Sequence, residues 1–203
     1  MKKLISICLT VMVSLLFAAC GNGSATQSNQ NQIQAESSAP ANGSSNSDKK
    51  ILIAYFSHSG NTEAVAQQIH DMIGGDIVKI ETVNPYPSDY HECTEVAKAE
   101  KDSNARPQLS TVIDNMNDYD TIFIGYPIWW HTAPMAIGTF LESYDLSGKT
   151  IVPFCTSGGS DISESMPMIK ELCQKATIKE GLTASKNDVE KTKAWLQKLG
   201  YVK

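Results

Sequence analysis

Three short polar segments contain the side chains whose types and spacing could do chemistry. They are residues 57–62 (Ser-His-Ser-Gly-Asn-Thr), 125–134 (Gly-Tyr-Pro-Ile-Trp-Trp-His-Thr-Ala-Pro) and 156–161 (Thr-Ser-Gly-Gly-Ser-Asp). Hydroxyls and glycines suit an anion held by neutral donors, and tryptophan suits a flat aromatic ring. None of the three segments contains a lysine or an arginine. The pattern therefore indicates a site that binds a phosphate and a ring.

The first segment separates a predicted strand from a predicted helix. Residues 51–56 are a continuous apolar run, and residues 60–73 carry apolar side chains at helical spacing. The free N–H groups of a helix N-terminus favour a dianion, and Ser57, Ser59 and Thr62 would add hydroxyl donors. A triphosphate loop needs a lysine and a dinucleotide fingerprint needs three glycines, so a monophosphate fits best. Taken alone, the segment could equally be an ordinary helix N-cap.

Two adjacent tryptophans, Trp129 and Trp130, follow another buried run at residues 121–125. Consecutive side chains of an extended segment point to different sides, and a buried indole needs a partner for its N–H. At least one tryptophan should therefore face a ligand or solvent. The alternative is that one packs under a helix and the other lies at the surface. In the third segment, Gly158 and Gly159 would let the backbone approach a ring edge, although Gly-Gly alone indicates only a turn.

Strands and helices alternate from residue 50 onward, and they must position these segments. Besides the strand and helix above, we predict strands at 76–80, 121–125, 150–155 and 176–179, and helices at 91–101, 134–144, 162–173 and 187–199. This alternation predicts an open parallel sheet with helices on both faces, which binds ligands beyond the carboxyl ends of its strands. The least clear piece runs from 84 to 116, where Tyr86, Tyr90 and His91 could cover a ligand or merely pack.

The order Ser-x-Ser-Gly-Asn-Thr at 57–62 resembles the phosphate loop of flavodoxins, and Pro-Ile-Trp-Trp at 127–130 resembles the ring-binding loop of a lipoprotein-associated branch of that family. The resemblance covers residues 50–203. It implies a flavodoxin-like α/β three-layer sandwich with a five-stranded parallel sheet in the order 2-1-3-4-5. It also implies flavin mononucleotide (FMN) as cofactor, with the chemistry carried by FMN and no catalytic side chain.

The implied cofactor-binding residues come from all three loops. They are Ser57, His58, Ser59, Gly60, Asn61, Thr62, Pro127, Ile128, Trp129, Trp130, His131, Thr132, Ser157, Gly158 and Gly159. Either histidine could exchange a proton with reduced flavin, but a role in shaping the pocket is the preferred interpretation, since the cofactor itself carries the chemistry.

The first 49 residues are predicted to deliver the domain rather than to fold. Two lysines, an apolar run at 4–17 and two alanines precede Cys20, which is the layout of a secretory signal peptide at 1–19. The run is short for a membrane span of about 20 residues, which is the alternative. Leu-Phe-Ala-Ala-Cys at 16–20 resembles a bacterial lipobox and implies a lipid on Cys20. The small polar residues at 20–49 predict a flexible, lipid-anchored tether on an extracytoplasmic membrane face.

Composition excludes several partners. With 17 Lys and Arg against 22 Asp and Glu, the net charge of −5 argues against nucleic acid. No C-x-x-C pair and no histidine at ligand spacing occurs, so no metal is expected. The leading function is electron transfer to a redox partner protein or a small acceptor. The alternatives are an FMN-dependent NAD(P)H:quinone-type reductase and a binding module without flavin.

Overall fold

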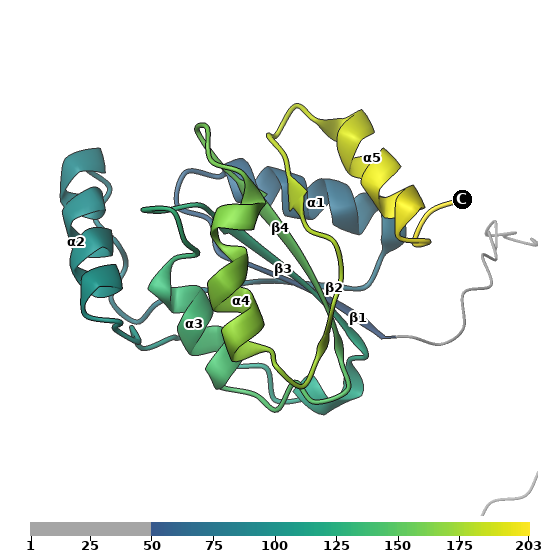
Figure 1. The fold of residues 1–203 in the computed structure, drawn as a ribbon, viewed down its shortest axis with the longest axis horizontal. Helices are drawn as coiled ribbons and strands as arrows, with labels where there is room; N and C mark the ends of the chain where they lie inside the picture. The colour runs from purple at the N-terminus through teal and green to yellow at the C-terminus, as the bar shows by residue number, and fades with distance from the viewer. Residues whose placement is uncertain (1–49) are drawn as a thin grey trace, which may run out of the picture. The chain divides into compact units, whose positions relative to one another are not determined.

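One parallel sheet forms the centre of the structure, a computed structural model that describes residues 50–203 (Figure 1). Its strands are β1 (Ile51–Tyr55), β2 (Asp76–Lys79), β3 (Thr121–Pro127), β4 (Thr150–Thr156), β5 (Thr177–Ile178) and β6 (Leu182–Thr183). The order is β2-β1-β3-β4-β5, with β6 also paired to β4, so the predicted order is confirmed. The predicted signal peptide (1–19), lipid site (Cys20) and tether (20–49) lie outside the described residues.

The fifth position of the sheet is divided between β5 and β6, where the sequence predicts a single strand. The Lys179 N–H donates to Ile151 O at 2.9 Å, and the Ala184 N–H donates to Cys155 O at 2.9 Å. Pro153 lies between these two acceptors on the same edge of β4, and proline has no N–H to donate. The outer chain therefore leaves the ladder opposite Pro153 and rejoins it at β6.

Alternating side chains of the strands enter two separate cores, one on each face of the sheet. On β1, Leu52 and Ala54 join the core beneath α3 (Met135–Glu142) and α4 (Met166–Leu172). Ile53 and Tyr55 join the core beneath α1 (Asn61–Ile73) and α5 (Val189–Lys198). Because both faces are covered, the strands are apolar without interruption, as the sequence predicts.

The predicted helix at 162–173 is broken into a 3₁₀ turn, η2 (Ile162–Glu164), and α4. The break lies at Ser165, whose hydroxyl donates to Ile162 O at 2.8 Å and lies 3.0 Å from the Tyr126 hydroxyl. Pro167, near the start of α4, cannot donate the N–H that a continuous helix needs there. A serine that bonds the preceding turn and a proline together explain the interruption.

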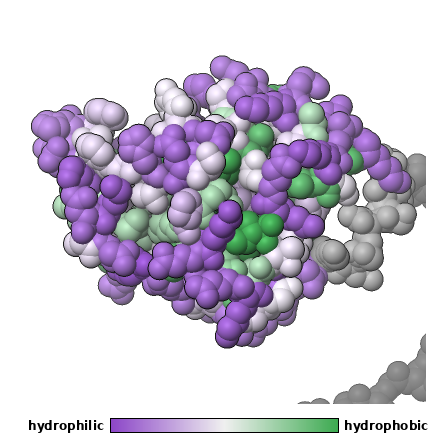
Figure 2. Space-filling view, in the orientation of Figure 1, coloured by the Kyte–Doolittle hydropathy of each residue, from purple (hydrophilic) through white to green (hydrophobic). Residues whose placement is uncertain are grey.

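The helix α2 (Tyr90–Asp102) lies beyond the carboxyl ends of the strands (Figure 1). It begins at Asp89, whose carboxylate accepts the Glu92 N–H at 2.9 Å. Another 3₁₀ turn, η1 (Met116–Asp118), leads into β3. Within residues 50–203, no helix has the length and apolar character needed to cross a membrane. The face of the domain drawn in Figure 2 is mainly hydrophilic, with apolar side chains in separate small areas.

Candidate functional site

The three predicted loops meet at the carboxyl edge of the sheet. The first follows β1 and leads into α1, the second follows β3, and the third follows β4. The Ile128 N–H donates to Thr156 O at 2.9 Å, which joins the second and third loops. The hydroxyls of Thr62 and Thr156 lie 2.8 Å apart and are buried, which joins the start of α1 to the end of β4. Thr62 therefore lies beneath the loop rather than at its surface.

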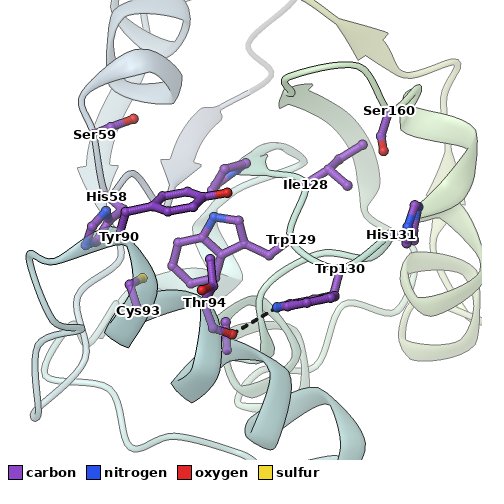
Figure 3. Close-up of a pocket in the computed structure, with 12 residues that line it drawn as sticks. His58, Ser59, Tyr90, Cys93, Thr94, Ile128, Trp129, Trp130, His131 and Ser160 are labelled. Atoms are coloured by element: carbon purple, nitrogen blue, oxygen red, sulfur yellow. Dashed lines mark hydrogen bonds between the residues drawn. The ribbon is translucent and has the colours of Figure 1, made fainter.

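A cavity of about 370 Å³ lies among these loops (Figure 3). Seven of the predicted residues line it: His58, Ser59, Pro127, Ile128, Trp129, Trp130 and His131. Five further lining residues were not among the predicted cofactor contacts: Tyr90, whose role the sequence left open, and Cys93, Thr94, Ala97 and Ser160. The remaining predicted residues lie around the cavity without lining it: Ser57, Gly60, Asn61, Thr62, Thr132, Ser157, Gly158 and Gly159.

The first loop leaves hydrogen-bonding groups unused. Ser57 is buried, and its Oγ has no partner among the described residues. Gly60 is the N-cap residue of α1, with a φ of 81°, and no side-chain hydrogen bond caps the helix. The amide of Asn61 donates to Ser59 Oγ at 3.1 Å. The ordinary N-cap alternative is therefore wrong, because no hydroxyl of the loop caps α1.

A cation reaches this region from another element. Lys79, at the end of β2, places its Nζ 3.6 Å from Glu63 Oε2 in the first turn of α1. Lys79 also lines a second cavity of about 260 Å³, together with Ser57 and His58, so His58 borders both cavities. The nearest charged partner of Lys79 in the described residues is thus the Glu63 carboxylate. Within the loop itself, residues 57–62, the groups that could bind an anion are hydroxyls and backbone N–H groups, as the sequence predicts.

The second loop contains a tight turn whose two central residues are Trp130 and His131. The Trp129 N–H donates to Thr132 O at 2.9 Å, and the Thr132 N–H donates to Trp129 O at 3.1 Å. Between them, Trp130 and His131 have φ values of 50° and 64°. Positive φ at both central residues is the geometry of a type I′ turn, which favours Asn and Gly. A tryptophan and a histidine there carry backbone strain, of a kind that often occurs at functional sites.

Trp129 is held in place by other aromatic rings. Its ring centroid lies 5.3 Å from that of Phe56, 5.1 Å from that of Tyr86 and 5.9 Å from that of His58, each with edge-on geometry. The Tyr86 hydroxyl donates to Glu100 Oε2 at 2.6 Å, and burial raises the pKa of both Tyr86 and Glu100. Trp129 thus packs on one side and lines the cavity on the other. Tyr86 is a packing residue.

Trp130 and His131 each bind a neighbouring element. The Trp130 indole N–H donates to the carbonyl of Thr94 in α2 at 3.0 Å, and 39% of the residue remains exposed. The His131 Nδ1 contacts a carboxylate oxygen of Glu164 in η2 and holds the pKa of Glu164 below its usual range. His58 bonds the Pro87 carbonyl through Nε2 at 2.8 Å. Both histidines are therefore engaged with protein groups, which favours a role in shaping the pocket.

The third loop is held by its own side chains. Ser157 Oγ accepts the N–H groups of Gly159 at 3.0 Å and Ser160 at 2.6 Å. Asp161 and Glu164 then form a capping box at the start of η2. A Cβ on Gly158 or Gly159 would meet no atom within 4 Å, and neither glycine has a positive φ. Nothing in the described chain requires glycine at these two positions.

Neither the acidic side chains nor the thiols of residues 50–203 form a further candidate site. Among residues 50–203, no group of three His, Cys, Asp or Glu side chains is placed to hold a metal ion. Cys93, Cys155 and Cys173 are free and buried. Burial raises the pKa of the Cys155 and Cys173 thiols to about 11, so both stay protonated at neutral pH.

Residues 50–199 match the flavodoxin family. The chain belongs to this family. A candidate flavoprotein from Bacteroides eggerthii is 39% identical over 74% of this chain and 97% of its own, with a TM-score of 0.68. One from Bacteroides uniformis is 34% identical over 73% of this chain and 98% of its own, with a TM-score of 0.68. No curated protein matches.

A flavoprotein from Lactobacillus acidophilus, crystallised in complex with FMN, shares the fold. It is 23% identical over 71% of this chain and 99% of its own, with a TM-score of 0.59. Membership of the flavodoxin family confirms the predicted fold class and the predicted cofactor, FMN.

The lining residues outside the predicted set of cofactor contacts come mainly from α2. Their positions, 90, 93, 94 and 97, follow the i, i+3, i+4, i+7 spacing of one helix face, so the pattern could have shown a shared face. It could not have shown what that face borders. Of the three residues left open in this region, Tyr90 lines the cavity, Tyr86 packs, and His91 is exposed with its Nδ1 4.0 Å from Glu95.

Proposed function

We propose that this flavodoxin-family domain is an FMN-dependent electron carrier, held at an extracytoplasmic membrane face by a lipid on Cys20. Family membership supports the FMN part. The lipobox-like residues 16–20 support the location. One observation ties the cofactor to this chain: among residues 50–203, the buried hydroxyl of Ser57 has no partner, and it belongs to the loop that leads into α1, a helix without a side-chain cap.

The phosphate of FMN would be bound by the first loop. The hydroxyls of Ser57 and Ser59 and the free N–H groups at the start of α1 are neutral donors, which suit a dianion at a helix N-terminus. Thr62 would position the loop rather than bind the phosphate, because its hydrogen bond to Thr156 anchors the first turn of α1 to the sheet. A buried donor without a partner costs free energy, and a phosphate oxygen would remove that cost.

The flavin ring would occupy the 370 Å³ cavity beside the half-buried face of Trp129. An aromatic ring on a flat ligand buries both surfaces, and Trp129 is already fixed by Phe56 and Tyr86. The open space at Gly158 and Gly159 would admit a ring edge close to the backbone of the third loop. Pro127, Ile128, Trp130, His131, Thr132 and Ser157 would shape the rest of this site.

When bound, FMN would supply the electron transfer itself. The protein would orient the ring, exclude water from its packed side and set the charge around it. The net charge of −5 would disfavour an additional negative charge on the ring and would suit a basic partner surface. The sequence carries no second nucleotide motif, which favours a carrier over an NAD(P)H-dependent reductase.

The test of the cofactor site is the binding of FMN and riboflavin to the full-length protein in detergent. The purified protein should be yellow, with the absorption of bound flavin. Ser57→Ala combined with Ser59→Ala should weaken FMN at least about tenfold more than riboflavin, because hydrogen bonds to a charged group contribute about 1.5–3 kcal/mol each. Equal losses for the two ligands, or a colourless protein that refuses added FMN, would refute the site.

Two further measurements test the remaining parts of the proposal. Steady consumption of NAD(P)H with a quinone, at enzymatic rates and without a partner protein, would favour the reductase over the carrier. For the location, wild-type protein should fractionate with membranes, and Cys20→Ala should lose the lipid, as mass spectrometry would show. A wild-type chain whose Cys20 carries no lipid would contradict the anchor while leaving the FMN site untouched.

A further inference from the structure

The inner face of α2 closes one side of the cavity. Tyr90, Cys93, Thr94 and Ala97 all line it, and they share one face of the helix. Cys93 and Ala97 are small and buried, so they leave space in front of the helix. This wall comes from a helix rather than from the three loops to which the FMN site is assigned above.

Tyr90 is far more exposed than an aromatic side chain that packs against the domain. It is 83% exposed, and Trp130 is 39% exposed. Among the described residues these are the two large aromatic side chains with substantial exposure, and both line the same cavity. Figure 3 shows the Tyr90 ring extended from α2 toward the centre of the cavity rather than away from it. Two exposed aromatic rings around one cavity are the surface that a flat aromatic ligand would cover.

α2 is bonded to the loops that border the cavity. Its Thr94 carbonyl accepts the Trp130 indole N–H at 3.0 Å, which joins it to the second loop. Just before the helix, the Pro87 carbonyl bonds His58 in the first loop at 2.8 Å. Because only two residues of α2, Cys93 and Ala97, are buried, these hydrogen bonds around the cavity are among the contacts that hold the helix. A ligand in the cavity would therefore contact and stabilise α2.

We propose that α2 is a fourth wall of the flavin site and that the Tyr90 ring contacts the flat isoalloxazine ring of FMN. This rests on the proposed function, because it takes the flavin ring as the occupant of the cavity. A volume of about 370 Å³ suits one flat ring system, with the phosphate outside at the first loop. Tyr90 is thus a cofactor-contact residue that lies on a helix rather than on the loops after β1, β3 and β4.

The test uses lumiflavin, which has the ring without the ribityl phosphate, and measures the quenching of flavin fluorescence with the full-length protein in detergent. Tyr90→Ala should weaken lumiflavin, riboflavin and FMN by the same factor, about tenfold, since a lost aromatic contact accounts for a change of that size. Tyr90→Phe keeps the ring and should bind within about twofold of wild type, the difference being a hydroxyl only.

Val96→Ala is the matched control, because Val96 is an exposed apolar residue of α2 that does not line the cavity. It should leave all three affinities unchanged. Tyr90 is 83% exposed, so its truncation should not unfold the protein, and circular dichroism checks this. Unchanged lumiflavin affinity in Tyr90→Ala would overturn the proposal that α2 is a fourth wall of the flavin site. If Ser57→Ala still weakened FMN selectively, the proposed FMN site would stand without it.

Hydrogen exchange gives a second measurement that does not depend on a variant. Lumiflavin and FMN should both slow amide exchange in α2, because the ring would stabilise the wall. α5 packs on the core of the opposite sheet face and serves as the internal control, with no change expected. If bound lumiflavin did not change the rate of amide exchange in α2, the inference would be overturned. A wild-type protein that binds neither lumiflavin nor FMN would refute the inference and the proposed function together.

Discussion

Replacing Ser57 with alanine should have opposite effects on stability and on cofactor affinity. In the protein without flavin, the buried Ser57 hydroxyl has no partner among the described residues. A buried polar group without a hydrogen bond costs about 1–3 kcal/mol. Because alanine removes the hydroxyl and little volume, Ser57→Ala should raise the free energy of unfolding of the flavin-free protein by about 1 kcal/mol, or about 2–4 °C in Tm for a domain of this size.

The same substitution should weaken FMN. A hydrogen bond to a charged group contributes about 1.5–3 kcal/mol, so the Kd for FMN should rise about 10- to 150-fold. Riboflavin, which lacks the phosphate, should be nearly unaffected. Urea unfolding followed by tryptophan fluorescence gives the stability, and quenching of flavin fluorescence gives the two affinities.

Ser165→Ala is the matched control, because Ser165 is also a buried serine but its hydroxyl is hydrogen-bonded. Its hydroxyl donates to Ile162 O at 2.8 Å and lies 3.0 Å from the hydroxyl of buried Tyr126. Losing this partner should destabilise the protein by about 1–3 kcal/mol. The reasoning would be refuted if Ser57→Ala destabilised the flavin-free protein as much as Ser165→Ala does, since the Ser57 hydroxyl would then be satisfied.

Two other substitutions test the packing around the site. Gly125→Ala should cost about 1–3 kcal/mol or more in urea unfolding, because its Cβ would overlap the buried Phe154 ring; a neutral result would mean that the ring moves freely. Burial raises the pKa of Glu100 above its ordinary value of 4.5, so the folded protein binds the Glu100 proton more tightly than the unfolded chain does. The folded state therefore loses stability as the pH rises from this ordinary value toward the raised pKa. Glu100→Gln can still accept from the Tyr86 hydroxyl and should therefore gain stability over wild type at pH 7 but not at pH 4, and equal gains would contradict this.

Local sequence patterns were sufficient for the order of elements and for the three loops. Continuous apolar runs mark strands covered on both faces, and β1, β3 and β4 lie at the runs from which they were predicted. Polar loops that follow such strands must meet at one edge of a parallel sheet, so seven of the predicted residues line one cavity. The strain at Trp130 and His131 could not be predicted, because neither residue type signals a type I′ turn.

Elsewhere, contacts between distant segments decided the outcome. The sequence shows a proline at 153. Only the pairing of β4 shows that the Pro153 nitrogen, which carries no hydrogen, lies on the side of the outer strand, and that the outer strand is divided there into β5 and β6. Thr62 looks like one more loop hydroxyl, yet its partner is Thr156, 94 positions away. Lys79 reaches α1 only because β1 and β2 are neighbours.

The sequence by itself thus determined which loops could hold a phosphate and a ring, because residue type and short-range spacing set strands, helix starts and hydroxyl placement. Only the tertiary structure decided which hydroxyl is left without a partner and which helix closes the cavity. Burial and long-range hydrogen bonds are properties of the packed molecule rather than of any segment. Ser57 and Tyr90 show this, since each owes its proposed role to what surrounds it.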